Sequence, residues 1–106
     1  MTDSELLELA AKAAGIELDW SAGGFNGPYY VNKLGGHSSF RPLTDDGDAL
    51  RLAVALRLSF VVMDSHIVIH GFAWPNLVIH EYSGDHYAAT RRAIVRAAAE
   101  IEKEMK

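Results

Sequence analysis

The chain contains no cysteine, which excludes a disulfide framework, a Cys-based zinc site, an iron–sulfur cluster and a thiol nucleophile. Long hydrophobic runs are also missing: the apolar stretch 60–63 is far shorter than the about 20 residues that span a bilayer. Residues 1–15 are amphipathic, unlike a signal peptide. An excess of positive charge is absent too, and the net charge of −4 argues against direct binding of nucleic acid through its phosphates. We therefore expect a cytoplasmic protein without a membrane partner.

The composition is typical of one folded domain over residues 1–106. Hydrophobic residues make up 49% of the chain and charged residues 23%, a balance that can build a buried core and differs from that of disordered chains. The length is that of a single domain, and no internal repeat divides it.

The N-terminal segment carries the signals of a helix over residues 3–14. Thr2 and Glu5 have the spacing of a capping box, in which the threonine hydroxyl accepts from a backbone amide and the glutamate carboxylate reaches back. An apolar stripe follows, and Gly15 is placed to take the left-handed conformation that ends many helices. The alternation of apolar and acidic residues over 16–20 then predicts a half-buried strand.

Two further helices are predicted later in the chain. The acidic stretch 44–48 is typical of a helix start, because carboxylates stabilise the free amides of a first turn, and it predicts a helix over about 45–57. The last helix is predicted to begin after residues 83–85 and to continue to the C-terminus. The predicted core positions are Leu50, Ala53, Val54 and Leu58 for the former and Tyr87, Ile94, Ala98, Ile101 and Met105 for the latter.

Three strands are predicted between these two helices. Residues 58–63 and 66–72 are rich in β-branched and aromatic side chains and are joined by two polar residues, which indicates a hairpin, and 77–82 is predicted as the third strand. A two-residue turn places Phe60 opposite Ile69 on the core face. The opposite face then holds a mixed set of side chains: Ser59, Val61, Met63, His66, Val68, His70 and Phe72.

The segment 21–42 is rich in glycine and is predicted to be mostly loop, with a short strand at 29–31 and a loop over 35–39. Taken together, the elements predict an α+β fold. In it, three helices are sandwiched with a small antiparallel sheet of three or four strands.

The stretches Phe40–Val54 and Tyr87–Ala99 resemble the phage ABA sandwich domain family, a group of small proteins of tailed phages and prophages without an assigned function. The resemblance covers residues 40–106 best, through the order of helix, sheet and alanine-rich terminal helix. It implies an antiparallel sheet between helices and a phage origin. It implies no reaction, because most of the shared residues are helix caps and buried alanines.

Histidines on the predicted strands are candidates for a metal site. His66 and His70 have a spacing that brings two rings to one face of a helix but separates them by about 13 Å on a strand. Asp64 with His66, or His70 with His80 from the neighbouring strand, are better placed for one ion. We favour the simpler interpretation that these histidines lie on a partly solvated sheet face, and we expect no metal and no cofactor.

Two other patterns have structural explanations. Asp45, Asp46 and Asp48 could hold a divalent cation, but the chemistry of a helix start already accounts for them. The glycines of 23–27 lack the lysine and the directly following helix of a phosphate-binding loop.

Large aromatic rings gather in or beside the glycine-rich loops, with basic residues nearby. Such rings can grip a planar ligand or a partner protein, because they add contact area with little entropy to lose. They can equally close the ends of a small core, and the sequence leaves both interpretations open. The candidate binding residues are Trp20, Phe25, Tyr30, Lys33, His37, Phe40, Arg41 and Trp74, and no catalytic residue is assigned.

These patterns favour a protein that binds rather than catalyses. The leading hypothesis is an accessory phage protein in the host cytoplasm that sequesters a host protein or a small signalling ligand, in a counter-defence role and as a symmetric homo-oligomer. A second hypothesis is a small metal-assisted hydrolase that uses Asp64, His66, His70 and His80. A third is an inhibitor of a host nucleic-acid-binding complex that acts through acidic residues, namely Asp45, Asp46, Asp48, Glu81 and Asp85.

Overall fold

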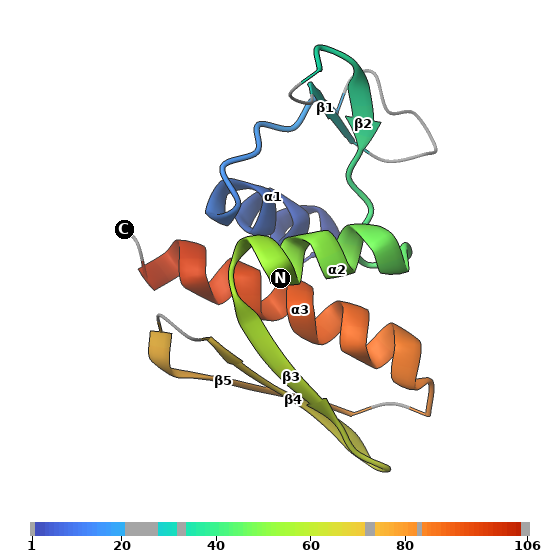
Figure 1. Cartoon of the computed structure of the whole chain (residues 1–106), viewed down its shortest axis with the longest axis vertical. Coiled ribbons are helices and arrows are strands. Elements are labelled where there is room, and N and C mark those ends of the chain that lie inside the picture. The colour runs from blue at the N-terminus through green and yellow to red at the C-terminus, as the bar shows by residue number, and fades with distance from the viewer. Residues whose placement is uncertain (1, 21–27, 32–33, 72–73, 83, 105–106) are drawn as a thin grey trace.

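The computed structural model describes residues 2–20, 28–31, 34–71, 74–82 and 84–104 and, for residues 31, 37 and 74–77, the backbone alone. This part of the chain forms three helices and five strands (Figure 1). In chain order they are α1 (Asp3–Ala13), β1 (Tyr29–Val31), β2 (His37–Ser39), α2 (Asp46–Ala55), β3 (Leu58–Val62), β4 (His66–Gly71), β5 (Trp74–Tyr82) and α3 (His86–Glu104). The predicted α+β class is confirmed.

Local signals define both ends of α1. The Thr2 hydroxyl accepts a hydrogen bond from the amide of Glu5 at 3.1 Å, and the Thr2 amide donates to the Glu5 carboxylate at 3.4 Å, so the predicted capping box is present. Gly15, with a φ of 75°, takes the left-handed conformation beyond the last turn. The strand predicted over 16–20 is wrong: this described segment makes an isolated bridge to Tyr29, because β1 pairs along its length with β2 instead.

The buried stripe of α2 agrees with the prediction at Ala53 and differs from it at two other positions. Leu50 and Val54 are 56% and 68% exposed, so their assignment to the core is wrong. The residues that pack inward are Ala49, Leu52 and Ala53. Both stripes are apolar, and the one with two alanines lets α2 approach α3 closely.

The larger sheet is antiparallel, in the order β3-β4-β5. Phe60 lies opposite Ile69, and the amide of Met63 donates to the carbonyl of His66 at 2.9 Å, which confirms the hairpin and its two-residue turn. β5 begins earlier than predicted, at Trp74. The smaller sheet pairs β1 with β2, so residues 37–39, predicted as loop, form a strand instead because β1 supplies them with a ladder partner.

α3 occupies the centre of the molecule, between the larger sheet and the other two helices (Figure 1). It is therefore buried on nearly all sides, and its many alanines allow close packing in both directions. Ile94 and Ile101 are 2% and 1% exposed, as predicted. Tyr87 is 72% exposed, so its assignment to the core is wrong: it lies in the first turn of α3, where the helix is least covered.

All three helices lie on one side of the three-stranded sheet (Figure 1). The inner face supplies buried residues such as Ile67 and Ile69, whereas outer-face side chains such as Val61, His70 and Tyr82 are exposed. A sheet with helices on both of its faces is therefore not confirmed. No helix in the described part of the chain is long and apolar enough to cross a membrane.

Candidate functional site

The aromatic residues predicted to bind a ligand lie partly around the small β1-β2 sheet. Tyr30 and Phe40 meet edge to face with ring centroids 6.5 Å apart, and Phe40 belongs to the core at 4% exposure. Trp20 is 41% exposed, and its indole N–H donates to the carboxylate of Glu8 on α1. Tyr30 and Phe40 thus connect the small sheet to the core, and Trp20 is held to α1.

The other predicted binding residues do not gather at one place. Arg41 is exposed beside β2. His37 belongs to β2 and Trp74 begins β5, and of both residues only the backbone is described. β5, which begins at Trp74, lies on the other side of the helices from β1 and β2 (Figure 1). Phe25 and Lys33 lie outside the described residues.

The histidines of the candidate metal site share the outer face of the larger sheet. The rings of His66 and His80 stack with centroids 5.6 Å apart, and His66 also stacks on Tyr82 at 5.4 Å. His70 is exposed on the same face. Within the described residues, no three side chains of types that ligate metals lie close enough to hold one ion. The arrangement is a ring stack in which His66 pairs with His80, and Asp64 does not complete a metal site.

The acidic residues at the start of α2 are engaged with neighbours. The Asp45 carboxylate accepts from the Asp48 amide at 2.8 Å and caps the helix. Asp48 accepts from Arg51 at 2.5 Å, and this hydrogen bond raises the pKa of the Arg51 guanidinium. Asp46 pairs with Arg91 at 2.7 Å. Helix capping and ion pairing therefore account for the cluster.

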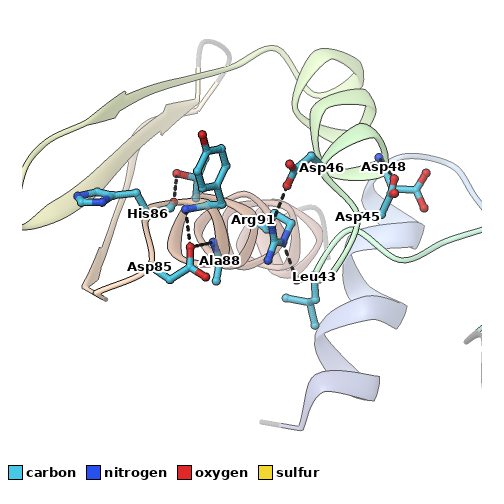
Figure 2. A network of polar contacts seen from close by, with 10 residues as sticks. Leu43, Asp45, Asp46, Asp48, Asp85, His86, Ala88 and Arg91 are labelled. Carbon is cyan, nitrogen blue, oxygen red and sulfur yellow. Dashed lines mark hydrogen bonds and ion pairs between the residues drawn. The ribbon is translucent and has the colours of Figure 1, made fainter.

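The two remaining acidic candidates are also in use. Glu81 pairs with Arg96 at 2.5 Å, and the Asp85 carboxylate accepts from the amides of Tyr87 and Ala88 at 3.0 and 3.2 Å (Figure 2). Asp85 thus caps α3. Within the described residues, Glu81 thus forms an ion pair and Asp85 a helix cap.

An apolar groove lies between α2, α3 and the inner face of β3. Its volume is about 630 Å³, within the range of sites for small molecules. The apolar lining residues are Ala49, Leu50, Phe60, Val62, Tyr87 and Ile94. Four of them remain exposed: Leu50 at 56%, Phe60 at 38%, Val62 at 51% and Tyr87 at 72%. Several large apolar side chains thus meet solvent at one concave place.

One end of the groove carries a fixed ion pair. Arg91 is 19% exposed; its Nε donates to the carbonyl of Leu43 at 2.9 Å and its Nη1 to Asp46 at 2.7 Å (Figure 2). These bonds hold the guanidinium between α3 and the start of α2. These two bonds use two of the five guanidinium N–H groups, so one N–H of Nη1 and both of Nη2 remain as donors.

The other end of the groove is bounded by His86. Its Nε2 lies 3.0 Å from the carbonyl oxygen of Met63 and 2.9 Å from that of Asp64. Both neighbours are acceptors, so Nε2 carries the proton, and in the neutral ring Nδ1 is an acceptor. His86 thereby ties the first turn of α3 to the β3-β4 turn.

Sequence reasoning missed this groove because it assigned its walls to the core. Leu50 and Tyr87 were expected to be buried, and Phe60 and Val62 belong to the predicted core face of the hairpin. Comparison with family models, curated proteins and solved structures found no match. The geometry of the groove therefore carries the functional argument.

Proposed function

We propose that the protein acts by binding, and that it sequesters a small, largely apolar ligand in the groove between α2, α3 and β3. The observation that carries this proposal is the exposure of Leu50, Phe60, Val62 and Tyr87 around one concavity. Burial of apolar surface contributes about 25 cal/mol per Å², so a ligand that covers these side chains gains most of its affinity from them. The concave shape favours a compact ligand over a flat contact.

The charged end of the groove gives the ligand an orientation. Asp46 neutralises Arg91, and the pair is fixed by the bond from Arg91 to the carbonyl of Leu43. A ligand with an acceptor group at one end would accept a hydrogen bond there from a remaining N–H group of Arg91, while its apolar body covers Leu50 and Tyr87. We therefore expect an amphipathic molecule.

The polar groups around the groove support binding over catalysis. Among the described lining residues, the titratable side chains that could move a proton are Asp46, His86 and Tyr87. Asp46 is held by Arg91, and the Nε2 proton of His86 is held by two backbone carbonyls. Nδ1 of His86 remains an acceptor, but the hydroxyl of Thr90, which also lines the groove, donates to the backbone carbonyl of His86 at 2.7 Å, so the described contacts do not pair a base with a nucleophile.

The biological setting of the proposal depends on the resemblance to the phage ABA sandwich family. An accessory phage protein in the host cytoplasm that removes a signalling ligand needs affinity and no turnover, which matches a binding groove. Sequestration also requires the protein in amounts comparable to its ligand.

The proposal is tested by fluorescence titration with 1-anilinonaphthalene-8-sulfonate, an apolar probe with one anionic group. Leu50→Lys places a charge in the groove wall, whereas the matched variant Val54→Lys places it on the same helix outside the groove. We expect Leu50→Lys to weaken probe binding by about tenfold or more, which corresponds to about 1.4 kcal/mol, and Val54→Lys to leave it unchanged.

Two results would contradict the proposal. One is equal probe binding by both variants, since the probe would then bind elsewhere. The other is a native mass spectrum of protein from infected cells that shows a retained small molecule in the Leu50→Lys variant as well as in the unmodified chain.

A further inference from the structure

β3 is an edge strand of the larger sheet: one side of its backbone pairs with β4, and the other side is free. The amides and carbonyls of alternate residues point to this free side. The hydrogen-bonded pair of Met63 and His66 sets the ladder, so Val61 and Ser59 also direct their amides and carbonyls towards β4. The backbone groups of the residues between them, such as Phe60, therefore point away from the sheet. Within the described part of the chain, no other strand pairs with this edge.

The edge lacks the features by which proteins usually prevent strand pairing. Its sequence, Leu58–Val62, contains no charged residue and no proline, and its ladder to β4 shows no bulge. Three of its side chains are at least 38% exposed, those of Phe60, Val61 and Val62. An apolar, regular edge of this kind is a template for another strand.

We propose that a second copy of this chain pairs antiparallel with β3, with the two Phe60 residues opposite each other at a two-fold axis. In this register Leu58 lies opposite Val62 of the partner subunit, and all the outward-facing residues of both strands form hydrogen-bonded pairs. A register shifted by two residues would leave one of these pairs unmade. The axis runs perpendicular to the sheet, so the helices of both copies lie on the same face of a six-stranded sheet.

Charges at the two ends of β3 favour a second copy of the chain as the partner and antiparallel as the direction of pairing. Arg57, exposed with a φ of 53°, precedes the strand, and Asp64, also exposed, follows it after one residue. Antiparallel pairing about Phe60 brings Arg57 of each copy to the end of the strand that carries Asp64 of the partner subunit. Parallel pairing would bring like charges together, so the pattern is self-complementary only in the antiparallel direction.

The pairing would also complete the groove. Phe60 and Val62 form its floor beside the free edge, so the grooves of the two copies would meet across the axis and share one floor. This consequence rests on the proposed function, because it makes the binding site a product of both copies. The pairing itself does not depend on any ligand.

The absence of cysteine allows a direct test by single cysteine variants. At the proposed axis the two Cα atoms of residue 60 lie about 5.5 Å apart, within the range of a disulfide, whereas those of residue 59 are diagonal neighbours about 7–8 Å apart. Under mild oxidation we expect Phe60→Cys to form a covalent dimer at least about tenfold faster than the matched variant Ser59→Cys. Equal rates for the two variants would overturn the proposed register.

The unmodified chain and two variants of Val62 supply an independent measurement by sedimentation velocity. The chain should sediment as a dimer. Val62→Pro removes an outward amide and should yield a folded monomer, whereas Val62→Ala keeps the amide and should retain the dimer. A monomeric unmodified chain, or a dimer that survives Val62→Pro, would overturn the proposal. The Leu50→Lys variant alters the groove wall on α2 without changing β3 and should still sediment as a dimer, so failure of the dimer and failure of the groove are distinguishable.

A charge exchange tests the direction of the pairing. Arg57→Glu and Asp64→Lys should each weaken the dimer, and the double variant should restore it, because the opposite charges still meet. If the double variant instead loses as much dimer stability as the two single variants together, antiparallel pairing through β3 is refuted.

Discussion

Two leucines on α2 allow the boundary between core and groove to be measured. Leu52 is 3% exposed and Leu50 is 56% exposed, although they are two residues apart on one helix. Replacing Leu52 by alanine removes buried atoms and leaves a cavity, which typically costs about 2–5 kcal/mol of unfolding free energy. Complete burial of a leucine side chain contributes about 1.5–3 kcal/mol, so Leu50, less than half covered, contributes about 1 kcal/mol or less. The higher helix propensity of alanine offsets a few tenths of this, about 0.2 kcal/mol.

The assay is urea unfolding followed by circular dichroism at 222 nm, repeated at several protein concentrations so that any contribution of association is visible. In thermal unfolding, 1 kcal/mol corresponds to about 4–8 °C for a domain of similar size. A loss of about 2 kcal/mol or more should therefore lower the Tm of Leu52→Ala by about 8 °C or more, and a loss of about 0.8 kcal/mol or less should lower that of Leu50→Ala by about 6 °C at most. Equal losses for the two variants would refute the argument, because Leu50 would then be a packed residue and the groove would not be open at that wall.

Three further stability predictions follow from the described contacts. Ile94→Ala should cost about 2–5 kcal/mol in urea unfolding, because the side chain is 2% exposed, and a cost below about 1 kcal/mol would contradict its burial. Gly15→Ala should lower stability by about 1–2 kcal/mol in a thermal scan, because alanine is strained at the left-handed φ of 75°. Gly84→Ala, the matched control, should have little effect in the same scan. Equal effects of the two substitutions would exclude a conformational cause. Arg91→Met keeps the packed stem but removes the charged hydrogen bonds, and should cost about 1.5–3 kcal/mol in calorimetry.

Local signals were read correctly from the sequence because they need no knowledge of the rest of the chain. The capping box at Thr2, the left-handed Gly15 and the turn that places Phe60 opposite Ile69 depend on a few neighbouring residues. Which face of a helix is buried, in contrast, depends on the rest of the chain. α2 carries two adjacent apolar stripes, and both satisfy helical periodicity, so the stripe containing Leu50 could be excluded only by knowing that alanines face α3.

The prediction that Tyr87 is buried failed for a related reason. It continues the apolar periodicity of α3, but periodicity does not show where the neighbouring helix ends. The strand over residues 37–39 was missed because its sequence has no strand signal, and its partner β1 alone makes it a strand. In each case the missing information was the position of a distant element.

The groove and the free edge have a common origin in the widths of a helix and of a sheet. A helix with its side chains is about 10–12 Å wide, and strands are spaced about 4.8 Å apart, so three strands present a face of about 14 Å. α3 packs mainly on β4 and β5 and touches β3 little, and α2 reaches β3 only in part. The inner side of Phe60 and Val62 therefore stays open, at an edge strand that contains no charged residue. A second copy joined through β3 would turn this uncovered margin into the interior of a wider sheet, with two α3 helices on it and the shared groove between them. The same packing limit that leaves apolar surface exposed in one copy thus predicts where the second copy binds and where the ligand lies between them.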